Sequence, residues 1–133
     1  MRTRASALAL AAVAVLLLVS PVGAQEMIDK LKNTTPQQRA TLQNALMKEK
    51  LGLTDAEEPK IAAINLKYAE KMEPVIKGDL GMFARVREMR QINQAKEAEL
   101  QQALTPPQFQ KYLAAKDEIR QKFEEKISEK QSQ

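Results

Sequence analysis

A helix-start pattern occurs twice in this chain, each time between two long amphipathic segments. The clearer copy spans residues 104–108 (LTPPQ), and the other spans residues 53–57 (LTDAE). A third, looser instance without the leading Leu spans residues 35–38 (TPQQ). In each copy a threonine in the N-cap position can accept a backbone hydrogen bond, while a Gln or Glu three residues later reaches back to the threonine's own N–H. The residues predicted to form or support these helix starts are Leu53, Thr54, Glu57, Leu104, Thr105 and Gln108.

Apolar residues recur at intervals of three and four along the chain, which is the spacing of one helix face. The pattern predicts helices from Thr35 to about Lys50, from Thr54 or Glu58 to the glycine at 78, over 81–103, and from Thr105 to about Glu129. Residues 25–34 are predicted as a short helical arm. No stretch of five or more residues alternates with period two, so we expect an all-α fold without strands.

Breaks in these helices come from glycine and proline. Gly52 is expected to end the first helix, and residues 78–81 to form a turn in which Asp79 caps the next helix. Pro59 and Pro74 interrupt the second helix, and Pro74 should kink it. Because each long helix has only one narrow apolar stripe, we expect an elongated hairpin arrangement or one completed by a second copy.

The first 24 residues resemble a secretory signal peptide. Arg2 and Arg4 precede an apolar run of roughly 13 residues, and small residues lead up to Ala24. The run is short of the roughly 20 residues that a spanning helix requires, although an uncleaved anchor is the alternative. We therefore expect cleavage after Ala24, a periplasmic location, and a single domain over residues 25–133. Removing the two arginines lowers the net charge from +4 to +2, which is unlike the basic profile of a nucleic-acid-binding domain.

Residue types required by many enzymes are missing. The sequence has no His and no Cys, and its only serines after residue 24 are Ser128 and Ser132, so a Ser–His or Cys–His nucleophile cannot be formed. The usual ligands of zinc, copper and iron are also absent. Carboxylates alternate with Lys and Arg, as on a solvated helix face with ion pairs. We expect neither enzymatic activity, nor a cofactor, nor a metal.

One group of side chains on the third predicted helix is a candidate binding surface. Methionine is flexible and suits partners of variable shape, and arginine attracts acidic segments while its stem packs on apolar groups. The alternative is that the methionines belong to the core and the arginines to a solvated face. The candidate residues are Met82, Phe83, Arg85, Arg87, Met89 and Arg90.

The two Leu-Thr copies resemble the LTXXQ motif of the Spy/CpxP family of periplasmic proteins, with Glu57 in place of the motif's glutamine. The resemblance extends from about Thr35 to Ile127. It implies a four-helix hairpin fold that dimerises into a thin, curved cradle. Spy-like members are ATP-independent chaperones that hold unfolding clients, and CpxP-like members bind the periplasmic domain of a sensor kinase. Zinc-binding relatives use His-containing sites, which this sequence lacks.

Taken with this resemblance, the sequence leads us to expect a homodimeric chaperone that binds unfolded or misfolded envelope proteins without ATP. The alternative is a regulatory partner of an envelope-stress sensor kinase that has no general chaperone activity. A third possibility is a structural envelope component without clients.

Overall fold

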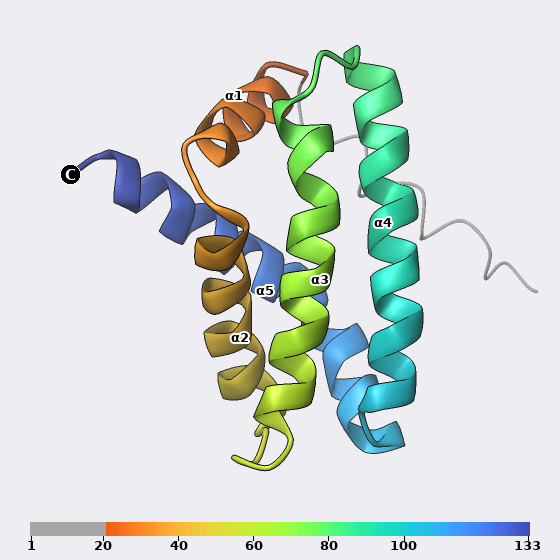
Figure 1. Ribbon diagram of the computed structural model, residues 1–133. Coiled ribbons are helices and arrows are strands. Elements are labelled where there is room, and N and C mark those ends of the chain that lie inside the picture. The colour runs from red at the N-terminus through yellow and green to blue at the C-terminus, as the bar shows by residue number, and fades with distance from the viewer. Residues whose placement is uncertain (1–20) are drawn as a thin grey trace, which may run out of the picture.

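The computed structural model describes residues 21–133, which form five α-helices and no strand (Figure 1). The expectation of an all-α fold is therefore confirmed over this range. Residues 1–20, which carry most of the predicted signal peptide, lie outside the described residues. None of the described helices combines the length and the hydrophobicity needed to cross a membrane. The helices are α1 (Pro21–Lys32), α2 (Pro36–Leu51), α3 (Glu58–Lys77), α4 (Met82–Ala103) and α5 (Pro106–Gln131).

The structure contains one helix more than the four long helices that we expected. The predicted arm at 25–34 belongs to α1, a 12-residue helix whose Ile28 and Leu31 are buried. Both side chains join a core cluster with Ile76 of α3 and Ile127 of α5. Because a short helix gains most of its stability from tertiary packing, its own sequence gave a weak signal.

Two of the expected capping boxes begin helices as predicted. The Thr35 hydroxyl accepts a hydrogen bond from the Gln38 N–H at 3.1 Å, and the Gln38 side chain accepts one from the Thr35 N–H at 3.0 Å. Thr105 and Gln108 repeat this exchange at 3.3 and 3.0 Å at the start of α5. Each box satisfies two backbone donors that the first turn of a helix leaves without a partner.

The remaining helix ends differ in how well they follow expectation. Gly52 ends α2 in the left-handed conformation (φ 63°), as predicted. α3 begins at Glu58, the later of the two predicted starts, so Pro59 lies in the first turn, where its missing N–H costs no intrahelical bond. Residues 78–81 form the expected connection, but Asp79 does not cap α4. Gly81 is the N-cap, and no side chain bonds there.

Figure 1 shows α2, α3 and α4 side by side, with α5 crossing behind them and α1 lying at one end. The main core cluster lies between α2, α3 and α5 and extends to the connection between α4 and α5. Its most deeply buried members include Met47, Ile61 and Leu100.

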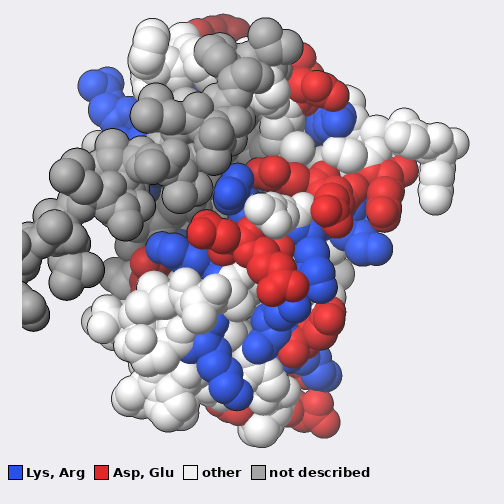
Figure 2. Space-filling model, turned by 180° about the vertical axis from the view of Figure 1, so that it is seen from behind, with Lys and Arg blue, Asp and Glu red and all other residues white. Residues whose placement is uncertain are grey.

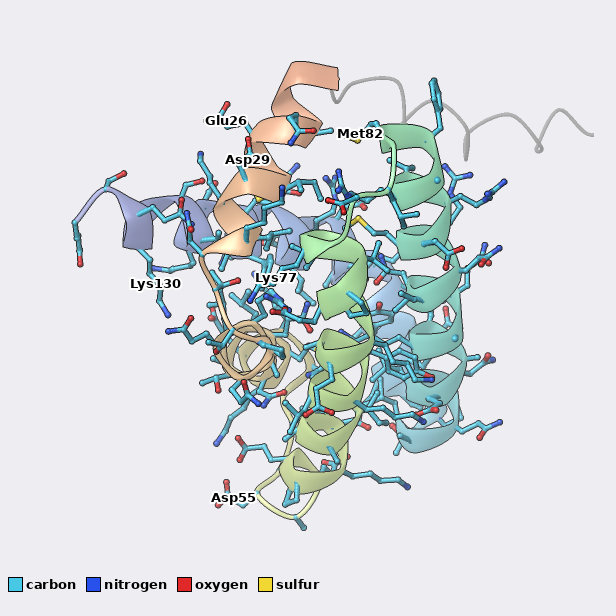
Figure 3. The ribbon with its side chains drawn as sticks, turned by 45° about the horizontal axis from the view of Figure 1, so that its top comes forward. Glu26, Asp29, Asp55, Lys77, Met82 and Lys130 are labelled. Carbon is cyan, nitrogen blue, oxygen red and sulfur yellow. The ribbon has the colours of Figure 1, made fainter. Side chains whose placement is uncertain are left out.

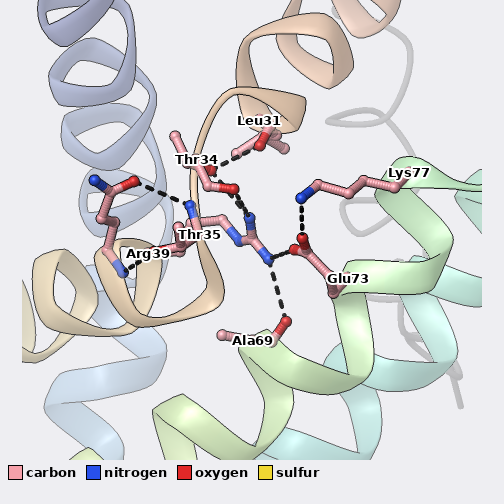
Figure 4. A network of polar contacts seen from close by, with 8 residues as sticks. Leu31, Thr34, Thr35, Arg39, Ala69, Glu73 and Lys77 are labelled. Carbon is pink, nitrogen blue, oxygen red and sulfur yellow. Dashed lines mark hydrogen bonds and ion pairs between the residues drawn. The ribbon is translucent and has the colours of Figure 1, made fainter.

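A buried arginine ties the connection between α1 and α2 to α3 (Figure 4). The Arg39 guanidinium donates to the Thr34 carbonyl at 3.1 Å, to the Thr34 hydroxyl at 3.0 Å and to the Ala69 carbonyl at 3.3 Å. It also forms an ion pair with Glu73, which bonds Lys77 at 2.6 Å. Burial opposes ionisation of Glu73, but its bonds to Lys77 and Arg39 outweigh this and lower its pKa. A fully bonded charge can be buried without a large penalty.

Candidate functional site

The two Leu-Thr motifs, far apart in sequence, contact each other. The Gln108 side-chain amide donates to the Glu57 carboxylate at 2.6 Å, across a sequence separation of 51 residues. Leu53 and Leu104, the first residues of the two motifs, are buried in the same core cluster. The motifs therefore join the start of α3 to the start of α5.

Glu57, which stands where the LTXXQ motif has a glutamine, provides a hydrogen-bond acceptor for the Gln108 amide of the second motif. Glu57 accepts bonds from the Thr54 N–H and hydroxyl through one oxygen, and from Gln108 through the other. Gln108 accepts from the Thr105 N–H through its oxygen and donates to Glu57 through its nitrogen. The bonds from Gln108 and Thr54 lower the pKa of Glu57, since they stabilise its charged form. Two glutamates at these positions would repel each other.

Helices α4 and α5 diverge from this junction because their far ends are held by different partners. Arg85, near the start of α4, donates to the Val75 carbonyl at 3.0 Å and to the Gly78 carbonyl at 2.8 Å, which fixes α4 to the end of α3. Near the end of α5, Ile127 packs on α1. α4 accordingly contacts α3 far more extensively than it contacts α5. A cleft remains between α4 and α5.

We call the outer part of this cleft the outer groove. It has a volume of about 850 Å³ and is lined by α1, α4 and α5. Figure 3 labels Met82 at the end of α4 that lies near α1, and Asp55 at the opposite end of the molecule, beside the motif junction. The apolar lining of the outer groove consists mainly of Met27, Ile28, Leu31, Met82, Val86 and Met89.

The deeper part of the cleft, which we call the inner cavity, measures about 410 Å³ and shares Met27, Leu31 and Met89 with the outer groove. Lys96 of α4 lines it and donates to the Gln43 side chain at 2.8 Å. Burial lowers the pKa of Lys96 to about 8, because desolvation disfavours the charged amine. Tyr112 also lines the cavity, and burial, followed by the charge of Glu97, raises its pKa to about 12.

Charges around the cleft are mixed. Lys116 pairs with Glu97 and Arg120 with Glu124, both at 3.4 Å. Figure 2 shows basic and acidic side chains interleaved over this side of the molecule, as expected for helix faces with ion pairs. Basic residues nevertheless outnumber acidic ones in the lining of the two compartments. The basic residues are Arg39, Arg85, Arg90, Lys96, Lys116 and Arg120, and the acidic ones are Glu97, Asp117 and Glu124.

The structure separates the six residues that the sequence grouped. Met82 and Met89 are partly buried and line the outer groove with the exposed Arg90. Of the two methionines, Met89 also packs against the core cluster of α1, α3 and α5. Phe83 is 95% exposed and Arg87 is exposed, but neither lines the outer groove.

Arg85 corrects our expectation of an exposed arginine cluster. It is only 6% exposed, and its guanidinium is occupied by the carbonyls at the end of α3. One feature of the sequence indicates this role, because an arginine near the start of a helix that follows a short break can reach back to the preceding helix. Lys96 and Gln43 were not identified from the sequence at all. Their meeting depends on how α2 and α4 are placed in space.

Among residues 21–133, no three His, Cys, Asp or Glu side chains come together as metal ligands would. One protein family, described as a domain of unknown function (DUF4890), matches residues 24–112. The match includes both Leu-Thr motifs, all of α4 and the start of α5. Neither the curated proteins nor the solved structures contain a significant match to this chain.

Proposed function

We propose that this chain, which belongs to the DUF4890 family, is a periplasmic chaperone-like protein that binds unfolded or misfolded envelope proteins without ATP. The observation that carries this proposal is the outer groove, an open and largely apolar surface of about 850 Å³ lined by three methionines. Flexible methionine side chains can repack around segments of different shape, which a binder of many clients requires.

Exposed side chains in the first half of α4 and just before it add two further kinds of attraction. Phe83 is 95% exposed and Leu80 is 40% exposed, so an apolar client segment would find contacts before it reaches the groove. Arg87 and Arg90 make no ion pair or side-chain hydrogen bond with any described residue and are free to attract acidic segments. Charge would bring the client near, and apolar contact would then hold it, so neither step needs a nucleotide.

The cradle-like homodimer implied by the Spy/CpxP resemblance is part of this proposal. Its support is the open outer groove, which two copies could join into one longer binding face. Sedimentation equilibrium over a range of protein concentrations tests it. A monomer at every concentration would contradict the dimer while leaving client binding to be tested separately.

The proposed function is tested by following the aggregation of a chemically unfolded client with and without the purified protein, with no ATP present. We expect suppression at near-stoichiometric amounts. The double variant Arg87→Glu/Arg90→Glu should suppress less, whereas Lys60→Glu/Lys111→Glu makes the same charge change on exposed lysines outside the groove and should not.

The role of charge can be separated from the role of apolar contact by adding salt. Capture through Arg87 and Arg90 should weaken as the Debye length falls from about 10 Å at 0.1 M to about 3 Å at 1 M ionic strength. A folded, helical protein that gives no protection at any salt concentration would refute the proposal. It would favour the alternative, in which this chain is a regulatory partner of an envelope-stress sensor kinase and has no general chaperone activity.

A further inference from the structure

The inner cavity contains a positive charge without a negative partner. The Lys96 amine donates to the Gln43 carboxamide oxygen at 2.8 Å, and no carboxylate of the described residues lies within 4.0 Å of it. The nitrogen of the same carboxamide bonds no residue in the described part of the chain. Lys96 and Gln43 therefore offer several N–H donors at one point of the cavity wall, and none of them is neutralised by the protein.

The rest of the inner cavity combines an apolar wall with charged residues that it shares with the outer groove. Met47, Met72, Met89, Phe123 and two tyrosines form the apolar part, and the shared charged residues are Glu97, Lys116, Asp117, Arg120 and Glu124. A charged amine in such surroundings lowers stability unless it is paired, so its presence points to a function. Its lowered pKa of about 8 still leaves the amine mainly protonated at neutral pH, as pairing with an anion requires.

We propose that the inner cavity binds an amphipathic carboxylate of the fatty-acid class, with its carboxylate on Lys96 and Gln43 and its chain along the methionines. The volume of about 410 Å³ falls within the range of about 300–1,000 Å³ common for small-ligand pockets. The cavity continues into the outer groove, which gives a longer chain room to extend.

The polar groups favour a carboxylate over a phosphate. Lysine is a point charge rather than a planar fork, and both guanidinium groups of the inner wall already have partners. Arg39 is bonded to Glu73 and three further acceptors, and Arg120 pairs with Glu124. One amine and one amide match the two oxygens and single charge of a carboxylate. This inference concerns a small ligand and does not depend on client binding.

The tyrosines provide a direct readout. The chain has two tyrosines and no Trp, and both Tyr68 and Tyr112 line the inner cavity. We would titrate the purified protein with sodium laurate below its micelle concentration and follow tyrosine fluorescence, with thermal unfolding as a second measure. Dodecanol, which has the same chain length but no charge, is the matched ligand. Laurate should bind saturably at one site, at least tenfold more tightly than dodecanol.

Variants identify the residue that carries the binding. Lys96→Met should weaken laurate binding at least tenfold and leave dodecanol binding nearly unchanged. Lys60→Met, which removes an exposed lysine outside both compartments, should bind laurate like the wild type. Arg87→Glu/Arg90→Glu should also retain laurate binding, which separates this inference from the proposed function.

Several results would overturn the inference. These are equal affinity for laurate and dodecanol, undiminished laurate binding by Lys96→Met, or no saturable signal. Uptake of many laurate molecules with loss of helical circular dichroism would do the same, because it would show detergent action rather than a site.

Discussion

Replacing Lys96 by methionine should make the protein more stable at neutral pH. The folded state lowers the pKa of this amine from 10.5 to about 8, so folding disfavours its charged form. At about 1.4 kcal/mol per pKa unit, the charge costs the folded protein about 3 kcal/mol at pH 7. Methionine has an apolar chain of similar length and carries no charge. Gln43 loses a partner but remains partly exposed, so little of the gain should be lost.

The pH dependence has a definite sign. Between pH 8 and 10.5 the unfolded chain holds the Lys96 proton more often than the folded protein does. The free energy of unfolding of the wild type should therefore rise with pH in this window, while the full penalty remains below pH 8. The advantage of Lys96→Met should consequently shrink, from about 3 kcal/mol at pH 7 to about 1 kcal/mol near pH 9.5.

Urea denaturation followed by far-UV circular dichroism at several pH values up to about 9.5 measures this difference. The upper limit keeps the titration below the ordinary tyrosine pKa of 10.0, because Tyr112 ionises later in the folded state. Comparing two variants at each pH cancels the titration of all other groups. Lys60→Met, an exposed control, should change stability little at any pH. A Lys96→Met protein that is no more stable than the wild type, or whose advantage does not vary with pH, would refute the reasoning.

Three further substitutions test two helix ends and a buried ion pair, each by urea denaturation. Gly78→Ala should cost about 1–3 kcal/mol, because its Cβ would lie 2.5 Å from a backbone carbonyl oxygen of α3. Gly81→Ala, whose Cβ meets nothing within 4 Å, should be nearly neutral. Equal effects of the two substitutions would contradict this. Arg39→Met should lower the free energy of unfolding by on the order of 3 kcal/mol, because it breaks a buried ion pair. The control Arg120→Met, at an exposed arginine, should cost less than about 0.5 kcal/mol. A small loss for Arg39→Met would show that the hydrogen bonds and ion pair of Arg39 contribute little to stability. Thr105→Ala should cost about 1 kcal/mol by removing the N-cap of α5, and no loss would mean that α5 starts without it.

The features that sequence reasoning predicted are the ones that local chemistry decides. A threonine and a glutamine three residues apart close a capping box by themselves, so the starts of α2 and α5 could be predicted. Gly52 was predictable for the same reason, since its positive φ is a property of one residue. The lengths of α3 and α4 followed from their apolar spacing.

Features that depend on tertiary position were not predictable. The Arg85 side chain points back to the end of α3, and no periodicity shows which carbonyls lack a partner there. The contact between Glu57 and Gln108 needed both motifs to arrive at one junction, although their complementary side chains were visible in the sequence. The cleft results from sparse packing between α4 and α5, and the spacing of apolar residues indicates which faces are buried but not where two helices separate.

The sparse packing between α4 and α5 has a physical origin in the middle of α4. Asn93 and Lys96 occupy positions that line the inner cavity, where apolar side chains would let α4 close onto α5. Burial of additional apolar surface stabilises a fold by about 25 cal/mol per Å². A fold in which α4 closed onto α5 would therefore be more stable than one that keeps the cleft open. Replacing Asn93 and Lys96 together by leucine should therefore raise the free energy of unfolding and at the same time abolish laurate binding. If the double variant lost stability, polar residues in α4 would be needed for folding rather than for keeping the cleft open. If it gained stability and still bound laurate, the cleft would not have closed.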